Sequence, residues 1–105
     1  MLDSILQRFL QGASTLKPHI IAIRLFGSRA TGKERPDSDY DLCLVVTDDF
    51  SATDKDALYE VVMDILLDTG RLVSLKIFRQ QAFERLRSLQ TPFIRHVLTQ
   101  GIPVG

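Results

Sequence analysis

Residues 20–46 constrain the fold more than any other part of the chain, because two apolar segments there enclose a polar loop. Residues 20–26 are apolar and rich in β-branched side chains, and residues 39–46 lead from two aspartates into a second apolar run, so both predict strands. Gly27 breaks the first strand, and the polar residues 33–38, which include a proline, predict a loop. The rest of the chain then serves as a scaffold for this strand–loop–strand unit.

Two aspartates stand at alternate positions near the start of the second predicted strand, with Tyr40 between them. Because strand side chains alternate between faces, Asp39 and Asp41 should project from the same face, with Cα atoms roughly 6.5 Å apart. Carboxylates placed in this way can converge on one Mg²⁺, which proteins commonly hold with one or two carboxylates, substrate phosphates and water. Tyr40 should point to the other face and pack there. The pattern predicts a divalent-metal site at Asp39 and Asp41.

Gly27 and Ser28 directly follow the first strand and supply a candidate phosphate-binding turn. A glycine permits close backbone approach to a ligand, and a short helical turn starting here would present backbone N–H groups to an anion. The Ser28 hydroxyl can donate to a terminal phosphate oxygen. Arg29, Lys33 and Arg35 could neutralise a triphosphate, although basic side chains in loops are often only solvated.

The spacing of these two candidate sites carries a family resemblance. Ten residues separate Ser28 from Asp39, and this arrangement resembles the G-S-x10-D-x-D signature of the nucleotidyltransferase superfamily related to DNA polymerase beta. A wider pattern is similar to the small prokaryotic branch of that superfamily, the minimal nucleotidyltransferases, through Gly27-Ser28-x-Ala30-x-Gly32 and Ser38-Asp39-x-Asp41-Leu42.

The resemblance implies a polymerase beta-like palm fold and an enzyme that uses ATP or another NTP. Such an enzyme transfers a nucleoside monophosphate to an acceptor and releases pyrophosphate, with Mg²⁺ as its metal. The resemblance also implies roles for single residues: Asp39 and Asp41 are catalytic and bind the metal, and Gly27 and Ser28 hold the β and γ phosphates. We expect Arg29 and Ser38 to complete the nucleotide-binding residues.

Members of this branch are often paired with a helical protein of the HEPN type in toxin–antitoxin modules, and some add AMP to a tyrosine of that partner. The chain departs from the family pattern on its next predicted strand, residues 72–78, where a third acidic residue is usual. The polar positions there are Ser74 and Lys76. Because general-base help contributes about 10²–10⁴-fold, nucleotide binding can survive while turnover becomes slow. Two functions therefore stay open: a nucleotidyltransferase, and an antitoxin-like subunit that covers a helical toxin.

Hydrophobic periodicity and capping signals predict the remaining elements. They give a fold of the α/β (α+β) class, with a small mixed sheet, helices packed on one face, and the other face open near the motif. The predicted helices are residues 2–14, a helix capped by Ser51 or Thr53 and ended by Gly70, residues 80–89 and a helix from Pro92 to Gly101; the further strands are residues 72–78 and 102–104.

The length of 105 residues predicts a single domain, residues 1–105. Thirteen basic residues balance thirteen acidic ones, which makes a nucleic-acid partner unlikely because a broad footprint needs a basic excess. The lone cysteine, Cys43, excludes an internal disulfide, is expected to be buried, and with two histidines makes a zinc site unlikely. No segment suggests a membrane span or a signal peptide, so we expect a cytoplasmic protein, and a homo-oligomer stays open.

Overall fold

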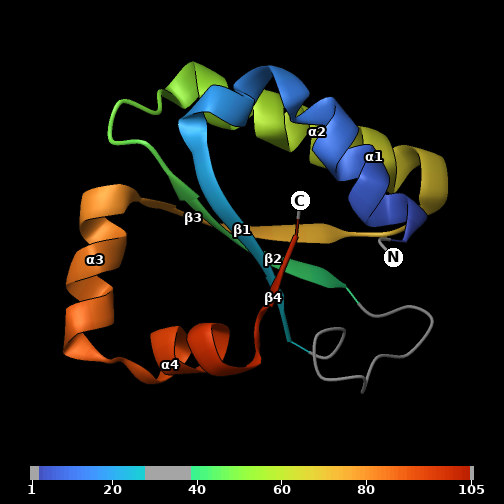
Figure 1. Cartoon of the computed structure of the whole chain (residues 1–105). Coiled ribbons are helices and arrows are strands. Elements are labelled where there is room, and N and C mark those ends of the chain that lie inside the picture. The colour runs from blue at the N-terminus through green and yellow to red at the C-terminus, as the bar shows by residue number, and fades with distance from the viewer. Residues whose placement is uncertain (1–2, 28–38, 105) are drawn as a thin grey trace.

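The computed structural model describes residues 3–27 and 39–104. A four-stranded sheet in the order β3-β2-β1-β4 forms its centre (Figure 1). Strand β1 pairs antiparallel with β2 and β4, whereas β2 pairs parallel with β3, so the predicted mixed sheet of an α+β fold is confirmed. The elements are α1 Ser4–Gly12, the 3₁₀ segment η1 Ser14–His19, β1 Ile20–Phe26, β2 Tyr40–Val46, α2 Ala52–Thr69, β3 Val73–Arg79, α3 Gln80–Leu89, α4 Pro92–Gln100 and β4 Ile102–Pro103.

Helices cover both faces of the sheet, which corrects the expectation of helices on one face only. Helices α1 and α2 lie over one face, and α3 and α4 lie over the other (Figure 1). Along β2, Leu42 and Leu44 are fully buried toward α1 and α2, while Cys43 and Val45 pack with residues of α3 and α4. A central strand that is buried on both faces has a nearly continuous apolar sequence, and residues 42–46 have such a sequence.

Capping residues set the ends of the helices. Ser51 and Asp54 form a reciprocal capping box at the start of α2, and Gly70 ends that helix with a φ of 74°. The Thr91 side chain accepts from the backbone N–H of Ile94 at the start of α4. These local signals agree with the predicted boundaries of α2 and α4.

The N-terminal helix is shorter than predicted. The pattern predicts a helix over residues 2–14, whereas α1 spans Ser4–Gly12 and is followed by the 3₁₀ segment Ser14–His19. Pro18 lies inside that segment. An α-helix is disfavoured immediately before a proline, and the tighter 3₁₀ turns carry the chain on to β1.

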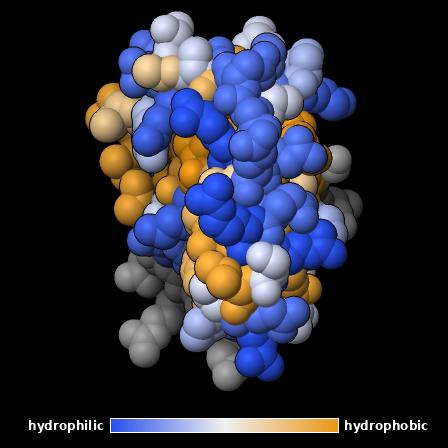
Figure 2. All heavy atoms as spheres, turned by 90° about the vertical axis from the view of Figure 1, so that its left-hand side faces the viewer, coloured by the Kyte–Doolittle hydropathy of each residue, from blue (hydrophilic) through white to orange (hydrophobic). Residues whose placement is uncertain are grey.

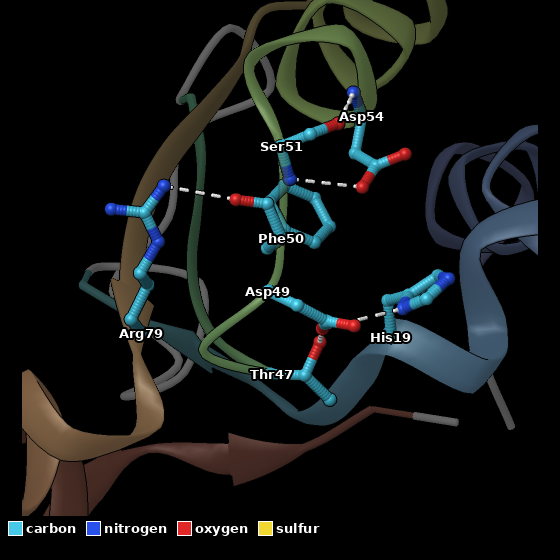
Figure 3. A network of polar contacts seen from close by, with 7 residues as sticks. All are labelled: His19, Thr47, Asp49, Phe50, Ser51, Asp54 and Arg79. Carbon is cyan, nitrogen blue, oxygen red and sulfur yellow. Dashed lines mark hydrogen bonds and ion pairs between the residues drawn. The ribbon is translucent and has the colours of Figure 1, made fainter.

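A loop between β2 and α2 ties several strand ends together at the end of the sheet away from Asp41 (Figure 3). The Thr47 hydroxyl donates to Asp49 Oδ1, and His19 Nδ1 lies 3.7 Å from the same oxygen. The hydrogen bond from Thr47 is the main reason that the pKa of Asp49 falls below its ordinary value. Arg79, at the end of β3, donates to the Phe50 carbonyl at 2.9 Å. The loop therefore holds the start of β1 and the end of β3 beside the start of α2.

The surface is mixed in character. The side of the molecule that bears α3 shows mostly hydrophilic side chains, with hydrophobic ones gathered at one margin and near its lower end (Figure 2). Within residues 3–27 and 39–104, no helix has the length and apolar character needed to cross a bilayer.

Candidate functional site

The start of β2 places the two aspartates beside both neighbouring strands. Asp41 lies opposite Phe26 of β1 and opposite Ser74 of β3 in the strand register. Asp41 is half-buried, and Asp39, one residue before the strand, is exposed. Because the two β2 neighbours of Asp41 point toward α1 and α2, its carboxylate is on the sheet face that carries α3 and α4.

The electrostatic environment of Asp39 and Asp41 favours the binding of a cation. Burial raises the pKa of Asp41 above its ordinary value, and the nearby charge of Asp39 raises it further. Lys76 lowers it in part. A half-buried carboxylate with a second carboxylate beside it would bind a divalent cation when one is available, because the cation relieves both the burial cost and the repulsion.

Gly27 brings the other end of the motif against Asp41. Its φ is +77°, a conformation that L side chains rarely adopt, and a Cβ added there would lie 2.5 Å from Asp41 Oδ2. Only glycine lets the backbone pass so close to the carboxylate in this conformation. The turn after β1 and the acidic start of β2 therefore form one contiguous site.

An aromatic contact holds the end of β1 in place. The Phe26 ring, next to Gly27 and opposite Asp41, meets Phe93 of α4 edge to face, with ring centroids 5.3 Å apart. Edge-to-face pairs are a favoured aromatic geometry. Helix α4 therefore supports the strand end that positions Gly27.

Tyr40 ties the start of β2 to α1. As expected, its ring is buried on the face opposite to Asp41. Its hydroxyl donates to Asp3 Oδ2 at 2.6 Å, while Asp3 Oδ1 accepts from the Leu6 N–H at 2.9 Å and caps α1. No local signal in the sequence predicts this bond, because the two residues are 37 positions apart.

Ser74 and Lys76 are the polar positions on the part of β3 that runs beside Asp41 and Cys43. Ser74 pairs with Asp41 across β2 and β3, and Lys76 pairs with Cys43 one step further along. Within the described part of the chain, no three His, Cys, Asp or Glu side chains gather as a metal-binding group. The described carboxylates of the site are therefore Asp39 and Asp41.

Cys43 lies between two cations on the same sheet face. Arg24 of β1 and Lys76 of β3 pair with it on either side. The thiol is 2% exposed, and burial raises its pKa to about 11. It stays protonated at neutral pH and fills the core, as the apolar surroundings in the sequence predict.

Three further candidates, Ser28, Arg29 and Ser38, lie outside the described residues, as do Lys33 and Arg35.

Residues 10–104 match the family model described as Polymerase beta, Nucleotidyltransferase. No curated protein sequence matches the chain.

Solved structures share the fold. One is a toxin–antitoxin crystallised with AMP-PNP (20% identity, TM-score 0.58, 93% of this chain and 70% of that chain). Another is a mutant of the toxin–antitoxin MntA-HpeT with two aspartate-to-glutamate changes (19%, 0.58, 97% and 72%). A third is described as a putative nucleotidyltransferase from Sulfolobus solfataricus (15%, 0.58, 93% and 75%). At these identities the likeness shows the fold alone.

Proposed function

This chain belongs to the polymerase beta nucleotidyltransferase family, and from that membership we propose that it transfers AMP from ATP, or another nucleoside monophosphate from its NTP, to a protein acceptor. The observation that carries the proposal is the close approach of the Gly27 backbone to the Asp41 carboxylate. In this proposal Asp39 and Asp41 are the catalytic carboxylates.

The donor set fits a hard divalent cation. Asp39 and Asp41 offer carboxylate oxygens, the ligands that Mg²⁺ prefers, and one of them is open to solvent. Bound there, Mg²⁺ would neutralise charge on the transferring phosphoryl group. Gly27, whose backbone lies against Asp41, is proposed to bind the nucleotide together with Ser28, Arg29 and Ser38.

The chemistry is a substitution at the α-phosphorus. An acceptor hydroxyl oxygen forms a bond to phosphorus, the bond to pyrophosphate breaks, and the hydroxyl proton leaves for a base. Ser74 stands beside Asp41 where an acid would serve as that base. We therefore propose slow turnover, since general-base help contributes about 10²–10⁴-fold.

The proposed acceptor is a tyrosine of a HEPN-type helical partner in the cytoplasm. Two solved structures with the same fold are described as a toxin–antitoxin, and one of them was crystallised with AMP-PNP. The alternative function is a catalytically weak antitoxin-like subunit that works by covering its partner, and Ser74, rather than an acid, beside Asp41 favours it.

Calorimetric titration of ATP with and without Mg²⁺ tests the nucleotide site. We expect Mg²⁺-dependent binding that disappears in the Asp39→Asn/Asp41→Asn variant. The matched control is Asp56→Asn/Asp64→Asn, which removes the same charge from the exposed surface of α2. If the site variant binds ATP as the parent chain does, the metal-site proposal is wrong.

Transfer from labelled ATP separates the two functions. Ser74→Asp supplies a carboxylate next to Asp41, so it should raise the transfer rate toward the 10²–10⁴-fold contribution of a general base. If the parent chain and the Ser74→Asp variant both bind MgATP but neither transfers the label, the antitoxin-like binding subunit is the favoured function.

A further inference from the structure

Helix α2 carries an apolar ridge on its solvent side. Tyr59, Met63 and Leu67 are spaced four residues apart and are 42%, 50% and 78% exposed. Residues at this spacing line up along a helix, so the three side chains form a continuous strip about 12 Å long at a rise of 1.5 Å per residue. Single exposed apolar residues are ordinary on protein surfaces, whereas a contiguous strip marks an interaction site.

A column of acidic side chains runs beside this ridge. Its members share the same four-residue spacing, and all are exposed: Asp56, Glu60, Asp64 and Asp68. Asp68 pairs with Arg8 of α1 at 2.7 Å, which places the column between α1 and the apolar ridge. In the described part of the chain, no ion pair involves the other three members.

The acidic column does not stabilise α2 itself. Like charges four residues apart repel each other, and each pair lowers helix stability by about 0.2–0.5 kcal/mol. Acidic side chains near a helix C-terminus also oppose the helix dipole, and no basic residue lies in the last turn of α2. Apart from the Asp68–Arg8 pair, the column makes no ion pair within the described residues, and a cationic partner would relieve its repulsion.

We propose that the ridge and the acidic column together dock a cationic amphipathic helix of a partner protein. Apolar side chains of that helix would cover Tyr59, Met63 and Leu67, and its Lys or Arg residues would face the acidic column. Charge complementarity of this kind sets the orientation and partner choice of helix pairs. The inference rests on the proposed partnership with a helical protein and does not depend on nucleotide transfer.

A second copy of α2 is a poor occupant of the same surface. The helix holds five acidic residues and one basic residue, so two copies packed ridge to ridge would bring like charges together. Like-charge juxtaposition suppresses such pairing.

The test uses a fluorescent amphipathic peptide of Leu and Lys, about 18 residues long so that it can form a stable helix. Anisotropy titration should show binding to the full chain, and a Leu/Glu peptide of the same pattern should not bind. Met63→Lys/Leu67→Lys should weaken binding at least about tenfold, a loss of about 1.4 kcal/mol, because apolar anchors at the centre of an interface carry most of its binding energy. The control is Leu89→Lys, which alters a 67% exposed leucine on α3 and should leave binding unchanged.

Hydrogen exchange on the peptide complex should show added protection over residues 56–68. Equal binding of the Leu/Glu peptide, equal binding by the double variant, or no binding at all would overturn the proposal. If sedimentation shows that the parent chain dimerises and the double variant does not, the ridge pairs with itself and the proposal is also wrong. Titration of MgATP into the same variants separates peptide docking from nucleotide binding. The substitutions on α2 should leave MgATP binding unchanged, because the proposed nucleotide site lies on the opposite face of the sheet.

Discussion

Replacing Gly27 with alanine should damage the candidate site more than the fold, and Gly70→Ala is its matched control. The two glycines have nearly the same backbone conformation, with φ values of +77° and +74°. Around Gly70, an added Cβ meets nothing within 4 Å, whereas at Gly27 it would lie 2.5 Å from Asp41 Oδ2. The two substitutions therefore share backbone strain and differ in one contact.

The expected magnitudes follow from that difference. An L residue in the left-handed region costs about 1–2 kcal/mol, so Gly70→Ala should lower the free energy of unfolding by that amount. At Gly27 the Asp41 carboxylate must also turn away from the added Cβ. Because this forces the Asp41 side chain off its preferred rotamer, the substitution costs about 0.5–1.5 kcal/mol more. In a chain of this size each kcal/mol lowers Tm by roughly 4–8 °C.

Urea unfolding and ATP calorimetry check this reasoning together. The excess cost of Gly27→Ala over Gly70→Ala should vanish in an Asp41→Ala background, where the clashing oxygen is gone. Mg²⁺-dependent ATP binding should be lost in Gly27→Ala and kept in Gly70→Ala. Equal costs in both backgrounds, with unchanged ATP binding, would refute the claim that Gly27 is needed to position the carboxylate.

Four further substitutions probe the site and its support. Because the folded-state pKa of Asp41 is raised above 3.8, its contribution favours folding below pH 3.8 and is lost as pH rises through the folded pKa. Asp41→Asn should therefore raise stability at neutral pH, measured by urea unfolding as a function of pH. Tyr40→Phe removes the hydrogen bond to Asp3 and should lower stability by about 1.5 kcal/mol, near the low end for bonds to charged groups because Asp3 regains water. Ser51→Ala removes the α2 cap and should cost about 1 kcal/mol in thermal unfolding. Leu44→Ala leaves a cavity at a fully buried position and should cost about 2–5 kcal/mol.

The local signals in the sequence were enough to predict most element boundaries. Residues 20–26 form the predicted strand, and Gly70 and Thr91 act at helix ends as their chemistry indicates. Strand β3 is displaced by one residue, to Val73–Arg79. Such signals work because propensity, capping and periodicity act over a few neighbouring residues.

Contacts between distant segments could not be predicted in the same way. The packing of Phe83 and Ile94 on the second sheet face depends on where α3 and α4 fold back, which no periodicity encodes. The bond between Tyr40 and Asp3, and the closeness of Gly27 to Asp41, likewise arise from strand pairing and helix docking. For the site, the sequence predicts which residue types take part, and the structure shows which of the described ones meet.

The alternation along β2 limits how this strand can evolve. Its even-numbered residues fill the core under α1 and α2. Its odd-numbered residues, which include Asp41, lie on the sheet face covered by α3 and α4. Gain or loss of one residue within the strand would exchange the two sets, sending a carboxylate into the core and a leucine toward the site. The length of β2 is therefore expected to stay fixed, because a change of length alters every later side chain of the strand at once.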